Sequence, residues 1–259
     1  MKELLKGTFL GITKIHFQWE GVTISETTYP AGLSSHWHYH QNPYFTLILN
    51  GGSIEERRGL RHECIPSQLL YYDFDEQHRN THYQADSQNV NVEFDRNWLE
   101  NKNMKLRSIK ERGFIRIALL RALHECRIND SLSYLSVQQL VLECQADLEN
   151  TLVKKNPQWV NKIREILWNR WDETPSLEEL SKELNLHPIT ISRFFARYFN
   201  CSLGDYVRRL KVEKALELLK GSHSSLIEIS MLCGFSDLSH FNRVFKSYIG
   251  YLPSEFRRQ

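Results

Sequence analysis

The sequence predicts an α+β protein with several domains, a β-rich N-terminal part and an all-α C-terminal part. Over residues 9 to about 94, apolar residues alternate with polar ones, as in residues 90–94 (VNVEF), and turn-forming residues such as those at 50–52 (NGG) separate these stretches. From residue 96 onward, apolar residues recur at helical spacings instead. The C-terminal part also contains a repeat, because residues 191–195 (ISRFF) correspond to residues 241–245 (FNRVF).

These patterns divide the chain into three regions. Many short strands with regular turns predict a small β-barrel or sandwich over residues 1–95. Residues 96–155 are expected to form two or three helices, and their apolar faces favour either a dimer surface or a monomer core. Residues 156–259 are expected to form the all-α domain, and the polar segment 150–156, which ends before Pro157, is the expected linker.

Composition restricts the compartment and the partners. The net charge of the 259 residues is +2, and by our count residues 157–259 carry +3. A mildly basic C-terminal part permits a nucleic-acid partner without requiring one. The five cysteines are dispersed and form no C-x-x-C pair, which is typical of reduced thiols in a cytosol. No signal peptide and no apolar run of about 18 residues is evident, so we expect a cytoplasmic protein that does not enter a membrane.

The all-α domain is predicted to contain a first helix-turn-helix unit over about residues 176–199. Ser176 and Glu179 have the spacing of a capping box, and Pro188 suits the first turn of the next helix. In that helix Ile191 and Phe195 are expected to be buried. The outward residues, which we expect to contact DNA, are Ile189, Thr190, Ser192, Arg193 and Arg197.

A second unit follows over about residues 225–249, after a long connecting helix that begins near Ser202. Ser225 and Glu228 form another capping-box pattern, Gly234 supplies the turn, and Ser236 is the expected cap of the second helix. The outward residues expected to contact DNA are Leu238, Ser239, Asn242, Arg243 and Lys246.

Two such helices on one chain predict contacts in successive major grooves, about 34 Å apart. Arg193 and Arg243 lie one turn into their helices, where an arginine can reach a guanine edge, and Asn242 could pair with adenine. Four further cations are expected to hold phosphates: Lys246, Arg197, Arg208 and Arg209. The helix N-termini at Ser176, Ser225 and Ser236 are expected to hold phosphates as well.

The motifs of the second unit resemble the signature of AraC/XylS-type transcriptional regulators. The matching residues are 234–237 (GFSD), 241–246 (FNRVFK) and the pattern of Gly250, Pro253, Phe256 and Arg257. The resemblance spans about residues 159–258 and implies a sequence-specific regulator that binds double-stranded DNA in the cytoplasm, at the nucleoid, with RNA polymerase as a partner. Asn185 and Asn200 stand where the family often has Gly, so we expect both to adopt a left-handed conformation.

Histidines are concentrated in the β-rich region. On a strand, His36, His38 and His40 would share one face. With Gly51, the pair His38 and His40 resembles the first cupin motif, H-x-H-x3-E-x6-G, although Tyr44 stands where metal-binding cupins have Glu. The second cupin motif is blurred, with His78 well beyond Pro66. The resemblance implies a cupin-like barrel whose candidate ligand-binding residues are His36, His38, His40, Tyr44 and His78.

Four functions are consistent with these residues. The leading hypothesis is a transcription activator, not an enzyme, that senses a small molecule in its barrel and needs no metal or other cofactor. The second is a regulator that senses a metal through His36, His38, His40 and His78. The third is a metal-dependent cupin enzyme with a helical appendage, which the missing Glu disfavours. The fourth is a module whose paired helices bind protein.

Overall fold

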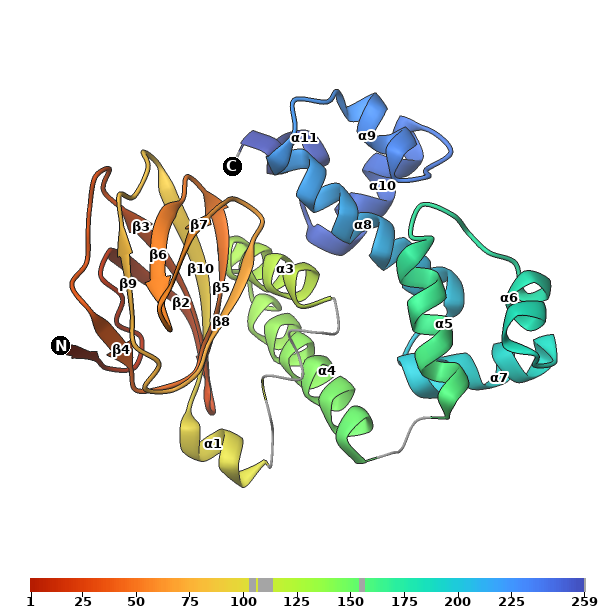
Figure 1. The fold of residues 1–259 in the computed structure, drawn as a ribbon, viewed down its shortest axis with the longest axis horizontal. Helices are drawn as coiled ribbons and strands as arrows, with labels where there is room; N and C mark the ends of the chain where they lie inside the picture. The colour runs from red at the N-terminus through yellow and green to blue at the C-terminus, as the bar shows by residue number, and fades with distance from the viewer. Residues whose placement is uncertain (103–105, 107–113, 154–156, 259) are drawn as a thin grey trace. The chain divides into compact units, whose positions relative to one another are not determined.

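The structure of the chain is a computed structural model that describes residues 1–102, 106, 114–153 and 157–258. It divides into two compact units (Figure 1). Unit 1 contains residues 1–111, 119–139 and 258–259, and unit 2 contains residues 112–118 and 140–257. Two helices, α3 (Ile115–Ile128) and α4 (Ser133–Val153), have residues in both units, whereas α1 (Arg96–Asn101) belongs to unit 1.

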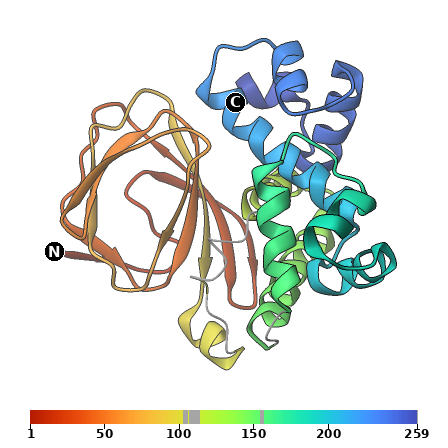
Figure 2. The ribbon, with the colours of Figure 1, turned by 45° about the vertical axis from the view of Figure 1, so that its right-hand side comes forward.

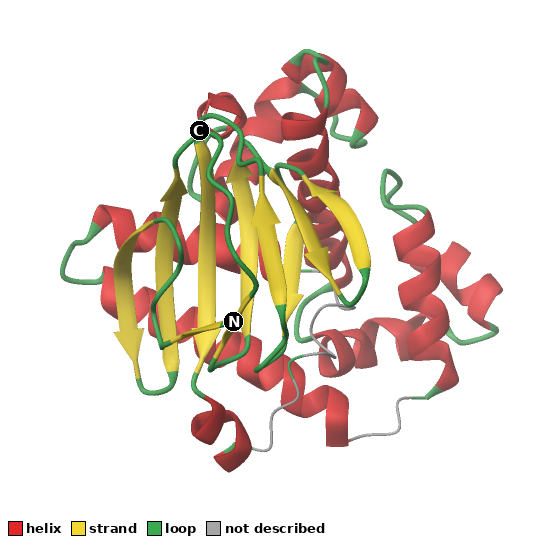
Figure 3. Cartoon of the chain, turned by 60° about the vertical axis from the view of Figure 1, so that its left-hand side comes forward, coloured by secondary structure: helices red, strands yellow, loops and turns green. Residues whose placement is uncertain are grey.

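Unit 1 is built on two five-stranded sheets that face one another (Figures 2 and 3). The first sheet has the strand order β1 (Lys2–Leu4), β4 (His38–His40), β9 (His78–Thr81), β6 (Ser53–Arg57) and β7 (Leu60–Cys64). The second has the order β2 (Ile12–Trp19), β3 (Val22–Tyr29), β10 (Ser87–Phe94), β5 (Tyr44–Asn50) and β8 (Leu69–Tyr72). All neighbours are antiparallel except β1 and β4. The β-rich N-terminal region expected from the alternation is therefore confirmed.

The second sheet has polar as well as apolar residues in its interior. Strand β10 lies between β3 and β5, and Val90 is paired with Glu26 on one side and Leu47 on the other. Beside these residues, the buried Thr46 hydroxyl donates to Asn91 Oδ1 at 2.7 Å, and Asn91 donates onward to Thr27 at 3.0 Å. A buried polar network whose hydrogen bonds are made rigidifies the interior and favours a single arrangement of its side chains.

Unit 2 is helical. Its elements after α4 are α5 (Gln158–Asn169), α6 (Leu177–Leu184), α7 (Pro188–Phe199), α8 (Leu203–Gly221), α9 (Leu226–Leu232), α10 (Leu238–Ile249) and α11 (Pro253–Arg258). One apolar core surrounds Ile163, Ile191 and Phe195 and includes residues from α5, α6, α7 and α8. In the second half of the unit Phe241 and Phe245 are fully buried with their ring centroids 5.7 Å apart. Within the described ranges, no helix combines the length and the apolar character needed to cross a bilayer.

Several helix boundaries follow the sequence predictions. Both capping boxes are present, since the side chains of Ser176 and Glu179, and of Ser225 and Glu228, bond reciprocally to each other's backbone N–H groups. Asn185 and Asn200 end α6 and α7 with φ values of 51° and 53°, so the left-handed conformations expected of them are confirmed. A short polar side chain lowers the cost of this conformation.

Two predicted boundaries differ in the structure. The cap of α10 is Asp237 and not Ser236, because Asp237 Oδ1 accepts from His240 N at 2.7 Å while Ser236 bonds to side chains. The predicted linker at 150–156 is helical through Val153, where α4 ends, because its residues include no helix breaker before Pro157. Residues 154–156 lie outside the described part of the chain.

The turn at Asn185 leads to a stability prediction. Replacing Asn185 with Ala should lower the free energy of unfolding of the C-terminal domain by about 1 kcal/mol, because Ala keeps the Cβ that is strained in the left-handed region but lacks the short polar side chain that lowers the cost of this conformation. The matched control is Asn185→Gly, which should change stability little, because Gly adopts positive φ without strain. Urea unfolding monitored by circular dichroism measures both variants. Equal losses in the two variants would contradict this explanation.

Candidate functional site

The second helix-turn-helix unit consists of α9, a turn at Gly234 and α10. Gly234 has a φ of 65°, which residues with a Cβ adopt only with strain. Helix α10 packs its aromatic face inward through Phe241 and Phe245. The residues predicted to point outward behave accordingly. Ser239, Arg243 and Lys246 are exposed, while Leu238 and Asn242 are half-buried.

The first unit consists of α6, a turn at Asn185 and α7. Helix α7 begins at Pro188 after His187, whose Nδ1 accepts from Ile189 N at 3.3 Å. Histidine is an unusual cap, and the sequence analysis did not predict this one. Of the residues predicted to contact DNA, Ile189, Ser192, Arg193 and Arg197 are exposed and Thr190 is half-buried. Ile189 is 67% exposed, so it does not pack into the core of the unit.

The cations on α7 and α10 differ from others in the same unit. Arg170 lies 2.7 Å from Glu183, and Arg209 lies 2.9 Å from Asp205. Arg208, also predicted to hold phosphate, is 3.7 Å from the same Asp205. By contrast, four cations on α7 and α10 have no ion-pair partner among the described residues: Arg193, Arg197, Arg243 and Lys246. Each of the two helices therefore presents positive charge to solvent that no carboxylate of the described residues neutralises.

Helix α8 joins the two units and buries charged residues that the sequence analysis missed. Glu213 is fully buried and accepts from Arg116 Nε at 2.6 Å, while Arg116 also donates to Glu217 at 2.9 Å. Burial raises the pKa of Glu213 to about 7, and the charge of Arg116 opposes this rise. Two residues earlier, Lys211 is also buried. Helical spacing alone does not show that polar residues occupy an inward face, so the sequence carried little signal for these groups.

The buried pair of Arg116 and Glu213 predicts a pH-dependent loss of stability. Arg116→Met should lower the free energy of unfolding by about 3 kcal/mol at pH 8, because a buried carboxylate loses its counter-charge. The loss should be smaller at pH 5. The pKa of Glu213 in the fold lies above the unfolded value of 4.5, so the fold binds the proton more tightly and stability falls as pH rises.

The control for this prediction is the double variant Arg116→Met, Glu213→Gln, which should lose most of the pH dependence because no buried carboxyl remains. Thermal unfolding between pH 5 and pH 8 gives the comparison. If Arg116→Met loses the same amount of stability at both pH values, the ion pair is not the cause of the loss.

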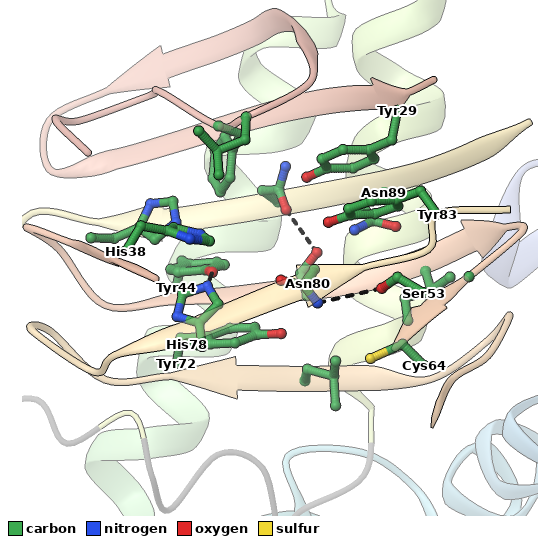
Figure 4. Close-up of a pocket in the computed structure, with 18 residues that line it drawn as sticks. Tyr29, His38, Tyr44, Ser53, Cys64, Tyr72, His78, Asn80, Tyr83 and Asn89 are labelled. Atoms are coloured by element: carbon green, nitrogen blue, oxygen red, sulfur yellow. Dashed lines mark hydrogen bonds between the residues drawn. The ribbon is translucent and has the colours of Figure 1, made fainter. Parts of the chain in front are cut away.

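A second candidate site lies inside the β-rich unit, in a small cavity with polar and aromatic side chains (Figure 4). Its volume is about 30 Å³. His38 and His40 of β4 and His78 of β9 are buried and adjacent, with at least one ring nitrogen of each lying within 4.8 Å of the others. The rings of Tyr44 and Tyr72 stack beside them at 4.5 Å, and Asn80 and Ser53 form a hydrogen bond further along the cavity.

Hydrogen bonds indicate the tautomers of two of these histidines. His38 Nδ1 lies 3.0 Å from the His36 carbonyl, and His78 Nδ1 lies 3.0 Å from the Glu76 carbonyl. Because a carbonyl only accepts, each Nδ1 carries the proton and each Nε2 has a free lone pair. The Tyr44 hydroxyl, 3.2 Å from His78 Nε2, is then the donor in that contact. The Nε2 lone pair of His38 is thus available to an electrophile or a donor, whereas that of His78 accepts from Tyr44.

Burial also keeps these rings uncharged. It lowers the pKa of His40 to about 2 and of His78 to about 3, with nearby histidines adding to the effect. The pKa of His38 is also lowered by burial. Burial raises the pKa of the Tyr44 hydroxyl, which stays protonated. At neutral pH the cavity therefore offers neutral imidazoles and hydroxyl groups to a ligand.

One predicted member of this group is absent from the cavity. His36 is exposed and lies outside β4, which begins at His38, so the prediction that three histidines share one strand face is wrong. The physical reason is that residues around Ser35 run as a loop bonded to Asn80 and do not continue the strand. His36 contributes only its backbone carbonyl, to His38.

A further buried polar cluster on β6 was not predicted. Glu55 is fully buried, and one of its carboxylate oxygens lies 2.8 Å from His62 Nε2 and 3.2 Å from Arg57 Nε. Burial raises the pKa of Glu55, and a hydrogen bond with Tyr72 and the charge of Arg57 oppose this rise. Ser53, Glu55 and Arg57 alternate along the strand, but period-two alternation does not reveal which face is inside.

Comparisons with known proteins concern mainly the helical part. A family model described as a helix-turn-helix domain matches residues 180–259. The Msm operon regulatory protein of Streptococcus mutans is 30% identical over 101 residues, which are 39% of this chain and 36% of that protein. The transcriptional activator RhrA of Rhizobium meliloti is 38% identical over 85 residues, or 32% and 27% of the two chains. The chain thus spans about a third or less of the length of these relatives.

Solved structures were also found to be similar to this chain. A transcriptional regulator from Chromobacterium violaceum, described as containing an AraC-type DNA-binding domain, matches with 22% identity and a TM-score of 0.38. The match covers 39% of this chain and 90% of that chain.

Proposed function

We propose that the protein is a transcription regulator that recognises DNA sequence, and that its C-terminal part, which matches a helix-turn-helix family model over residues 180–259, is a DNA-binding domain of the AraC type. The observation that carries the proposal is the pair of capped helix-turn-helix units. Their second helices, α7 and α10, both present arginines without an ion-pair partner among the described residues, at Arg193 and Arg243. The relatives are named as regulators of transcription and not as enzymes, which supports the same assignment.

The roles of the exposed residues follow from their chemistry. Arg193 and Arg243 have the fork geometry that pairs with a guanine edge, and Asn242 suits adenine. Lys246 and Arg197 lie one turn further along their helices and suit phosphate, which is contacted by charge and not by base identity. Arg208 and Arg209 would have to share their charge between DNA and Asp205.

This assignment predicts different effects for two cations on α10. Arg243→Ala should relax the preference at one base pair, because a good bidentate contact contributes about 1–3 kcal/mol of discrimination. Lys246→Ala, the matched control on the same exposed face, should weaken binding evenly across sequences and reduce the salt slope by about 1. Selection from random-sequence duplex pools, followed by titrations at several salt concentrations, measures both effects.

Two results would count against the assignment. If both variants weaken all sequences equally, Arg243 does not contact a base. If the wild-type protein enriches no sequence and its affinity has no salt slope, the protein is not a DNA-binding regulator.

For the N-terminal unit, we propose a cupin-like sensor whose cavity binds an effector that controls DNA binding. Neutral imidazole, hydroxyl and amide groups around the cavity support a small polar ligand. A cavity of about 30 Å³ is far smaller than the roughly 300–1,000 Å³ of typical ligand pockets, so an organic effector would require side chains to move.

A metal effector is the second candidate, favoured by the arrangement of His38, His40 and His78. Metal-binding histidines usually donate their other ring N–H to a carbonyl or carboxylate, as His38 and His78 do here. Imidazole ligands suit zinc, iron, nickel and copper. The Tyr44 hydroxyl would have to release His78 Nε2, and being protonated it is a poor fourth ligand.

The metal hypothesis predicts stoichiometric binding that depends on the buried histidines. After exposure to zinc or nickel and dialysis, the wild-type protein should retain about one equivalent per chain, whereas His40→Ala should retain little. His36→Ala is the matched control and should bind like the wild type, because His36 is exposed and outside the cavity. Elemental analysis gives the stoichiometry, and a wild-type protein that retains no metal would leave the organic effector as the better hypothesis.

The remaining partners are proposals of the same kind. An activator would contact RNA polymerase, and we propose a cytoplasmic, nucleoid-associated protein. A homodimer through residues 96–155 is supported by exposed apolar side chains at and near the start of α4, among them Leu132, Leu135 and Leu142. Such leucines lose contact with water when a second chain covers them.

A further inference from the structure

Lys211 occupies an unusual place for a lysine. It lies in the middle of α8, the helix between the two helix-turn-helix units, and its exposed fraction is only 6%. Lysine is almost never fully buried unless it is paired, because desolvating the ammonium group is costly. Burial lowers the pKa of Lys211, in line with its place in the fold. The contacts of the ammonium group must therefore offset the free-energy cost of its desolvation.

The ammonium group bonds to both halves of the domain. Lys211 Nζ donates to the Gly234 carbonyl at 2.6 Å and to the Thr174 hydroxyl at 3.2 Å. Gly234 lies in the turn between α9 and α10, and Thr174 lies in the segment between α5 and α6. These two acceptors are 60 residues apart in the sequence, so one side chain on the connecting helix links the turn of the second unit to the segment that enters the first.

Gly234 allows the turn between α9 and α10 to approach the segment between α5 and α6 closely. A Cβ at this position would lie 1.8 Å from the backbone oxygen of Asp172, much nearer than any van der Waals contact allows. The turn of the second unit therefore lies directly against the segment between α5 and α6. The Asp172 carboxylate also raises the pKa of Lys211, partly offsetting the desolvation. Gly234 thus serves the close approach as well as the positive φ of the turn.

Helices α7 and α10 each contact α8. Contacts with one helix leave each unit some freedom to tilt about it. A direct junction between the units removes part of that freedom, because a tilt of either unit would lengthen the Lys211 bonds or separate Gly234 from Asp172.

We propose that Lys211 is a positioning residue that sets the relative orientation of α7 and α10, and hence the number of base pairs between the two blocks of DNA that they contact. The inference rests on the proposed function, since it assigns the spacing preference of a DNA-binding protein. Lys211 does not itself touch DNA. It acts through Gly234 and Thr174, and the consequence is a preference for one spacing over its neighbours.

The test is a spacing profile. The probes are a two-block duplex enriched from a random pool by the wild-type protein, versions with one or two base pairs inserted or removed between the blocks, and duplexes with a single block. The wild type should lose about tenfold in affinity for a change of one base pair, comparable to one mismatched contact. In Lys211→Met, which keeps the length of the side chain but has no donor, this penalty should shrink to about twofold.

Single-block duplexes separate a positioning role from a general loss of structure. Lys211→Met should bind them within about twofold of the wild type, since each unit keeps its own core. The matched control is Lys214→Met, three residues further along α8, where the lysine pairs with Glu217 at 3.3 Å. Lys214→Met should keep the wild-type spacing profile.

If Lys211→Met does not fold, Thr174→Val replaces it as the test variant. This substitution removes only the hydrogen bond between Thr174 and Lys211 and keeps the shape of the Thr174 side chain. It should weaken the spacing preference by several-fold. If Lys211→Met folds and keeps the wild-type spacing profile, the inference is wrong but the proposed function stands. If Lys211→Met does not fold, an unchanged spacing profile in Thr174→Val has the same meaning. A wild-type protein without any sequence preference overturns the proposed function, and the inference with it.

Discussion

The helical domain depends on the burial of α8, whose residues complete the cores of the two small helix-turn-helix units. Helices of about eight to twelve residues are marginal in isolation, so the aromatic faces of α7 and α10 must find partners elsewhere. Tyr206, Val207 and Leu210 on α8 complete the core around Phe195. This burial also orients the opposite faces of α7 and α10, which is why Arg193 and Arg243 point to solvent without a carboxylate partner among the described residues.

Because helix α8 is central to the domain, some of its charged residues are buried. Glu213 needs the guanidinium of Arg116, and Lys211 needs the carbonyl of Gly234 and the hydroxyl of Thr174. Apolar residues in these positions could be as stable, because desolvation offsets much of the attraction in a buried ion pair. Charged groups instead restrict geometry, since each hydrogen bond is made in only one arrangement of its partners. The two residues lie two positions apart on α8 and hold different segments in unit 2.

The β-rich unit differs from the helical domain because polar and apolar side chains are mixed around its cavity. The histidines at its cavity remain neutral because burial lowers the pKa values of His40 and His78 by several units. Neutral imidazoles with lone pairs on Nε2 provide acceptors without the cost of a buried charge. The Tyr44 hydroxyl satisfies one of them at 3.2 Å.

Local chemistry determined most of what the sequence could predict. The capping boxes at Ser176 and Ser225, the left-handed turn at Asn185 and the outward arginines of α7 and α10 depend on residues within a few positions, so spacing was sufficient. Only the tertiary structure decided which polar residues are buried, and with which partners. The bonds of Lys211 to Thr174 and of Arg116 to Glu213 join residues 37 and 97 positions apart, and His36 left the cavity because its loop pairs with Asn80. Periodicity describes one element at a time, whereas these contacts arise when separate elements meet.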